Sequence, residues 1–199
     1  MILSILKFLF LGFFVNLITG FDDTITHIPI LSSITKTRMG KIAFGTGMFG
    51  AIILAIIIAI FFSTIIKAIP FYKEIFAGLL FGLAIAIYFD IVVHKPREKA
   101  KEKLLRFQKI SSERFTQLAV IGFIASLATV VDDIIAYAPL FGHGAFNDVF
   151  VAVGIALATI AEILLVIFFS EGLSKFRHKE KIASAGLVVL AVLILIGVI

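Results

Sequence analysis

FLGFFVNLITGFDDTITHIPIL occupies residues 10–31 of this chain, and VIGFIASLATVVDDIIAYAPLF occupies residues 120–141. The two segments share residue types at matching positions: Gly12, Phe13, Leu17, Thr19, Asp22, Asp23, Ile25 and Pro29 recur as Gly122, Phe123, Leu127, Thr129, Asp132, Asp133, Ile135 and Pro139. The chain therefore contains an internal duplication with an aspartate pair at the centre of each copy. Because ionisable residues are costly within a bilayer, aspartates in apolar segments usually mark the path of an ion or substrate.

The composition is that of an integral membrane protein. Hydrophobic residues make up 61% of the 199 residues and charged residues only 16%, and the mean hydropathy is +1.15. A helical crossing needs about 20 apolar residues, so the chain has room for six spans and no separate soluble domain. It contains no cysteine, which excludes disulfides and thiolate chemistry.

The apolar runs predict an all-α protein of six transmembrane helices, at about residues 3–33, 41–66, 71–93, 115–141, 149–170 and 182–199. The first and fourth runs are the long ones, and each carries a proline, Pro29 or Pro139, six or seven residues after its aspartate pair. An internal proline removes a backbone hydrogen bond and bends a helix. We therefore expect proline-broken helices in both of these spans.

Basic residues predict the orientation of the chain in the membrane. The connections at 34–41, 94–114 and 171–181 hold 15 of the 18 lysines and arginines, and only Lys7, Lys67 and Lys73 lie on the other side. Cytoplasmic loops accumulate such residues, so we expect these three loops in the cytoplasm and both termini outside the cell membrane. The nearby membrane lipids are then expected partners of the basic linker, and topology explains the net charge of +5 without nucleic acid.

This orientation makes the two copies of the motif antiparallel. Residues 1–93 would form a first three-helix repeat, 94–114 a basic linker and 115–199 a second three-helix repeat, giving a 3+3 inverted-topology repeat. Secondary transporters of this architecture bind substrate near the bilayer midplane, on broken helices where the repeats meet.

Helical spacing predicts which polar side chains share a face with the aspartates. The first span aligns Asn16, Thr19, Asp23 and His27, and the fourth aligns Ser126, Thr129, Asp133 and Tyr137. Asp22 and Asp132 lie about 100° further round their helices, facing a neighbouring span, where Glu162 is the best candidate for a supporting acid. The alternative is that the aspartates only join helices by hydrogen bonds, and His27 is equally explained as a packed histidine.

Four carboxylates at one site cannot all stay ionised without a counter-charge, because like charges and burial raise the pKa of each group. Either a cation or protons must bind, which predicts cation/proton exchange. Oxygen ligands favour Ca²⁺ or Mn²⁺, whereas His27 would suit Mn²⁺, Zn²⁺ or Cd²⁺.

The motifs Thr19-x-x-Asp22-Asp23 and Asp132-Asp133-Ile134-x-x-Tyr137-x-Pro139-Leu140-Phe141 resemble the cadmium-resistance transporter (CadD-like) branch of the lysine-exporter (LysE) superfamily. The resemblance implies a small six-span exporter in which Asp22, Asp23, Asp132 and Asp133 are ion-site residues supported by Thr19, Thr129 and Tyr137. This chain has Val131-Asp132-Asp133 where that family commonly reads Gly-Asp-Asn, which makes the site more acidic and is compatible with a harder divalent ion.

The leading interpretation is a secondary exporter of divalent metal cations, of the Cd/Mn/Ca class, by cation/proton or cation/Na⁺ antiport. Its expected partners are the transported cation and the coupling ion, and no cofactor is expected. Export of a small organic cation or amino acid is the main alternative, and a channel and a homodimer stay open. An enzyme is not expected, because the aspartate pairs lack the third acid of a prenyl-transferase motif and the first glycine of an intramembrane aspartyl protease.

Overall fold

A computed structural model describes residues 2–35, 37–89, 115–173 and 179–197, with side chains except at 21–26, 29–30, 32–34, 169–173, 179–180 and 182–183. Within these ranges every regular element is helical. The elements are α1 (Ile2–Ile34), α2 (Arg38–Lys67), α3 (Tyr72–Tyr88), α5 (Phe115–Leu127), α6 (Val131–Tyr137), the 3₁₀ helix η2 (Ala138–Leu140), α7 (Ala145–Leu173) and α8 (Lys179–Leu195). The predicted linker at 94–114 lies outside the described residues, and the division into two repeats stays a prediction.

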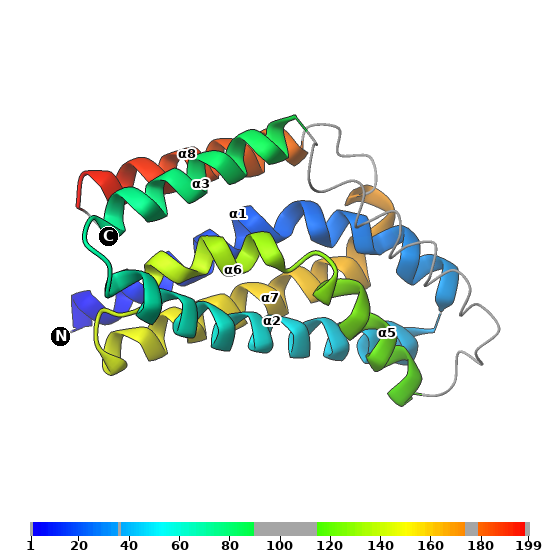
Figure 1. Cartoon of the computed structure of the whole chain (residues 1–199). Helices are drawn as coiled ribbons and strands as arrows, with labels where there is room; N and C mark the ends of the chain where they lie inside the picture. The colour runs from blue at the N-terminus through cyan, green and yellow to red at the C-terminus, as the bar shows by residue number, and fades with distance from the viewer. Residues whose placement is uncertain (1, 36, 90–114, 174–178, 198–199) are drawn as a thin grey trace.

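The helices run back and forth along one long axis, and both termini lie at the same end of the molecule (Figure 1). The most extensive packing joins α1 with α7, α2 with α5, and α3 with α8. The α3/α8 pair forms a layer of its own above α1 and α6 (Figure 1).

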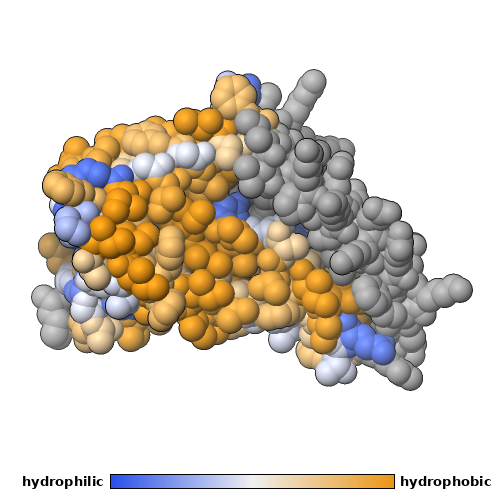
Figure 2. Space-filling model, viewed as in Figure 1, coloured by the Kyte–Doolittle hydropathy of each residue, from blue (hydrophilic) through white to orange (hydrophobic). Residues whose placement is uncertain are grey.

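The helix lengths agree with a membrane-spanning protein. Among the described residues, α1, α2 and α7 are each long and apolar enough to cross, and α5 with α6 makes a fourth span if the bent pair counts as one. Helices α3 and α8 have 17 residues each, which at about 1.5 Å per residue falls short of a hydrocarbon core of about 30 Å. Three or four of the six predicted spans are therefore supported by length. Hydrophobic residues also make up most of the described surface on the side seen in Figure 2.

The expected proline break in the first span is wrong. Helix α1 continues from Ile2 to Ile34 through Pro29, although Figure 1 shows that it changes direction in its second half. The fourth span is broken, but between α5 and α6, which meet at 65°. Pro139 lies in the first residues of η2, where a missing backbone N–H removes no helical hydrogen bond.

Glycines let two helix pairs approach closely, and the two contacts are alike. Where α1 crosses α7, and again where α2 crosses α5, each helix places a glycine against the backbone of the other, so that a methyl group there would collide with a carbonyl oxygen. The four contacts are Gly12 with Val151, Gly154 with Leu9, Gly122 with Phe44, and Gly47 with Ala119. Small residues at such crossings are the usual means of close packing between membrane helices.

Candidate functional site

The amide of Asn16 joins α1, α6 and α7 at the centre of the bundle. Its Nδ2 donates to Glu162 Oε1 at 3.2 Å, and its Oδ1 accepts from the Tyr137 hydroxyl and from Thr159 Oγ1 at 3.4 Å. All four side chains are buried, with exposed fractions of 4% or less. Since buried polar groups are stable only when hydrogen-bonded, this network fixes the carboxylate of Glu162 beside the first span.

A small cavity of about 20 Å³ lies next to this network. Its polar lining comes from α1, α5, α6, α7 and the α5/α6 break, and α2 closes it with apolar side chains; the lining residues are Gly20, His27, Met48, Ile52, Ser126, Thr129, Asp133, Thr159 and Glu162. The volume is close to that of a single water molecule. The cavity therefore gathers two carboxylates, an imidazole and three hydroxyl groups around a space for one small occupant.

The break between α5 and α6 positions the aspartates of the fourth span. The carbonyl of Ser126 accepts the N–H groups of Thr129 and Val130, both at 3.0 Å, and also the Thr129 hydroxyl at 3.1 Å, which ends α5. Helix α6 then starts with Asp132 and Asp133 in its first turn, where the helix dipole favours negative charge.

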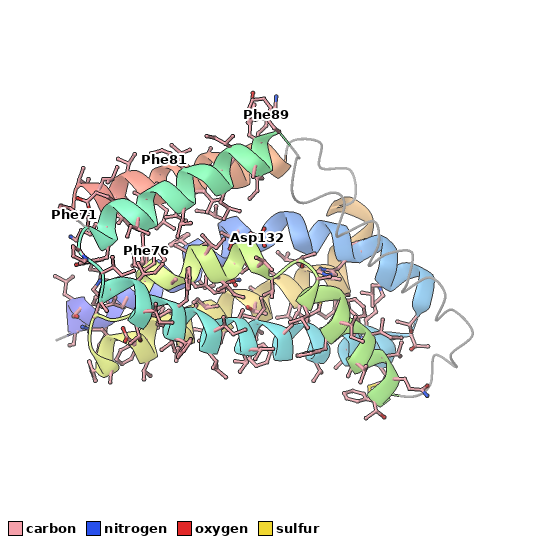
Figure 3. All side chains as sticks on the ribbon, in the orientation of Figure 1. Phe71, Phe76, Phe81, Phe89 and Asp132 are labelled. Carbon is pink, nitrogen blue, oxygen red and sulfur yellow. The ribbon has the colours of Figure 1, made fainter. Side chains whose placement is uncertain are left out.

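The two aspartates of this pair have different surroundings. Asp133 lines the cavity and is 2% exposed. Asp132 does not line it, and its Oδ1 accepts the Asp133 backbone N–H at 3.2 Å; Figure 3 marks Asp132 on α6, near the middle of the molecule. One member of the pair thus lines the candidate site and the other does not, which agrees with the spacing of about 100° between adjacent residues of a helix.

Of the predicted site residues on the first span, only some of those with described side chains line the cavity. His27 lines the cavity, and its ring lies 6.1 Å from that of Phe44 in an edge-on contact. Thr19 is buried but lies outside the cavity lining, and its hydroxyl donates to the carbonyl of Val15 at 3.1 Å. The side chains of Asp22 and Asp23 lie outside the described residues, so their place in the site stays a prediction.

No group of three or more His, Asp or Glu side chains that could hold a metal ion is found in the part of the chain that the structure describes. His27, Asp133 and Glu162 line the same cavity without forming such a group. The predicted metal site is therefore neither complete nor excluded by the described side chains.

Four residues of the cavity lining are not among the predicted site residues: Gly20, Met48, Ile52 and Thr159. Thr159 lies one turn before Glu162, so its place on the same face of α7 was open to prediction from spacing. Gly20 faces Glu162, and a Cβ there would come within 2.8 Å of Oε2. Met48 of α2 carries no sequence signal for a site, because only the packing of α2 brings it to the cavity.

No protein-family model, curated protein or solved structure matches this chain. The resemblance to cadmium-resistance transporters accordingly stays a prediction from the motifs alone.

Proposed function

We propose that this chain is a secondary-active exporter of divalent metal cations, working by exchange against protons or Na⁺. The observation that supports this proposal best is the buried cavity at the break of the fourth span, lined by Asp133 and Glu162 together with hydroxyl groups and His27. A space of about 20 Å³ accommodates one atom-sized guest. It is too small for an amino acid or organic cation, which favours an inorganic ion as the substrate.

The two carboxylates supply a reason for exchange. Buried away from water, Asp133 and Glu162 are stable only when a cation or protons compensate their charge. An ion entering from one side of the membrane would displace protons, and protons entering from the other side would displace the ion. The oxygen donors suit Ca²⁺ or Mn²⁺, and the nitrogen of His27 would extend the range to Cd²⁺ or Zn²⁺.

An inverted repeat would complete this site with a second pair of carboxylates. The sequence duplication aligns Gly12 with Gly122. Each of these glycines lies against the backbone of the second predicted span of the other half: Gly12 against Val151 of α7, and Gly122 against Phe44 of α2. A pseudo-two-fold axis between the halves would produce this equivalence. The same axis would bring Asp22 and Asp23 toward the site from α1, opposite Asp132 and Asp133.

Metal flux in proteoliposomes tests the proposal. The purified chain is reconstituted with a metal-sensitive dye inside, a pH gradient is imposed, and Mn²⁺, Cd²⁺ or Ca²⁺ is added outside. We expect Asp133→Asn and Glu162→Gln to reduce flux to the level of protein-free liposomes. Glu74→Gln, which removes an exposed carboxylate from the first turn of α3, is the matched control and should transport normally.

Two results would refute the proposal. Flux that is unchanged in both site variants would show that the cavity is not on the ion path. Metal flux that neither responds to nor dissipates a proton or Na⁺ gradient would indicate a channel instead of an exchanger. Asp23→Asn in the same assay tests whether the first span contributes, as the repeat predicts.

A further inference from the structure

Three lysines meet at the end of the molecule where both termini lie. Lys7 of α1, Lys67 at the end of α2 and Lys73 at the start of α3 line one cavity of about 310 Å³. These are the three basic residues that the sequence places outside the basic loops. The rest of the lining is Phe8, Tyr72, Phe76, Pro139, His143, Ile194 and Gly197, so the lining residues that the structure describes are basic or neutral.

Two acids lie near this lining in sequence: Glu74, which follows Lys73 and is exposed in the first turn of α3, and Asp148, which is already engaged. Asp148 accepts the backbone N–H groups of Gly142 and His143, at 3.0 Å each, and so holds the loop before α7. Lys67 is anchored through its Nζ, which donates to the carbonyl of Phe141 and lies 5.9 Å from the centre of the Tyr72 ring. A lysine ammonium has three donors, so this anchored group can still bind an anion.

An apolar groove of about 270 Å³ begins at the same place. It lies between α1 and α8, and Lys7 lines both it and the lysine cavity. The other lining residues are Phe10, Leu11, Phe14, Val15, Ile18, Thr19, Gly186, Leu187, Val189, Leu190 and Leu193. Hydrophilic patches lie at this end of the molecule beside the hydrophobic face (Figure 2).

The length of the groove matches one leaflet of a bilayer. It extends from Lys7 to Ile18 and Thr19, which is about 16 Å along a helix and about half of a hydrocarbon core of about 30 Å. At this inner end the side chain of Ile18 packs directly against Gly186 of α8, so that a methyl group on Gly186 would collide with it.

We propose that the lysine cavity and the groove together bind one anionic phospholipid. The phosphate lies among Lys7, Lys67 and Lys73, and one acyl chain follows the groove between α1 and α8. A zwitterionic lipid offers the same phosphate, but it brings a cationic group that the lysines repel. This site is separate from the cavity at Asp133 and does not depend on what the protein transports.

Native mass spectrometry of the full-length, delipidated protein tests this proposal. The probes are phosphatidylglycerol and phosphatidylcholine with identical acyl chains, and we expect preferential retention of phosphatidylglycerol. A basic residue near an anionic lipid contributes about fivefold in affinity, so Lys7→Gln with Lys73→Gln should lower retention roughly 25-fold. Lys67 stays unchanged because it holds the carbonyl of Phe141.

Matched controls separate this site from general charge and bulk effects. Arg38→Gln with Lys181→Gln removes the same charge from two exposed residues outside the cavity and should retain the preference. Val189→Trp fills the groove and should lower retention with all lysines present, whereas Val188→Trp, next to it but outside the groove lining, should not.

Three outcomes overturn the proposal. The first is equal retention of the two lipids, and the second is unchanged retention in both the lysine pair and Val189→Trp. The third is binding of glycerol 3-phosphate, which has the headgroup chemistry without an acyl chain, as tightly as phosphatidylglycerol. That third outcome would assign the lysine cavity to a small soluble anion.

Discussion

Gly47→Ala should destabilise the protein, although alanine is the better helix former. A Cβ at Gly47 would collide with the carbonyl of Ala119 and approach the backbone nitrogen of Phe123. Backbone atoms of a packed helix cannot move aside as the end of a flexible side chain can, so α2 and α5 must separate. Overpacking of this kind typically costs about 1–3 kcal/mol.

Gly78→Ala is the matched control for this substitution. Gly78 is also within a helix, α3, but a Cβ there would meet nothing within 4 Å. The change should therefore stabilise the protein by about 0.5–1 kcal/mol through helix propensity alone. Because both variants gain this helix propensity, they should differ by the overpacking cost alone, about 1–3 kcal/mol.

The assay is equilibrium unfolding in mixed micelles of dodecyl maltoside and increasing sodium dodecyl sulfate, followed by circular dichroism. Gly154→Ala, which places a methyl group against the carbonyl of Leu9 where α1 crosses α7, should behave like Gly47→Ala. If Gly47→Ala proves as stable as Gly78→Ala, the close crossing of α2 and α5 is wrong. If only one of Gly47→Ala and Gly154→Ala destabilises, the two crossings are not equivalent, and the support that helix packing gives to an inverted repeat is lost.

Two further predictions use the same unfolding assay. Tyr137→Phe removes the hydroxyl that donates to Asn16 Oδ1 and should cost about 1 kcal/mol, at the low end of the range for a buried partner, because Thr159 still donates to that oxygen; no loss would place the tyrosine outside the network. Burial and the neighbouring Lys67 ammonium lower the pKa of His143 below its ordinary 6.5, so the unfolded chain takes up that proton first and stability should fall as the pH drops below about 6.5. His143→Gln should weaken this pH dependence, and an identical pH profile in the variant would contradict the assignment.

The positions of the long helices could be predicted from hydropathy, because each long apolar run has one stable conformation in a membrane. The predicted spans 41–66 and 149–170 correspond to α2, Arg38–Lys67, and α7, Ala145–Leu173. The break in the fourth span could not be placed, because residues 128–130 contain neither proline nor glycine. The break was predicted at Pro139 because proline disrupts helices, but α6 already ends at Tyr137, two residues before Pro139.

Part of the candidate site was predictable from helical spacing, although the residues concerned lie on α5, on α6 and at the break between them and not on one continuous helix. Ser126, Thr129 and Asp133 were predicted to share a face, and all three line the cavity. Tyr137, the fourth residue of that series, instead donates to Asn16 on α1. Such partners between helices depend on the packing of the bundle, which no single-helix pattern contains.

The volume of the cavity at Asp133 has a consequence for which divalent ion could bind there. If the protein transports metal ions as we propose, a space of about 20 Å³ would leave no room for the hydration shell that an ion carries in solution, so an entering ion would have to exchange its waters for oxygen atoms of the protein. Mg²⁺ gives up its waters reluctantly, whereas Ca²⁺ accepts flexible sets of oxygen ligands. The small volume of this cavity would thus select against Mg²⁺, the smaller and more strongly hydrated ion, because removing its waters costs more free energy.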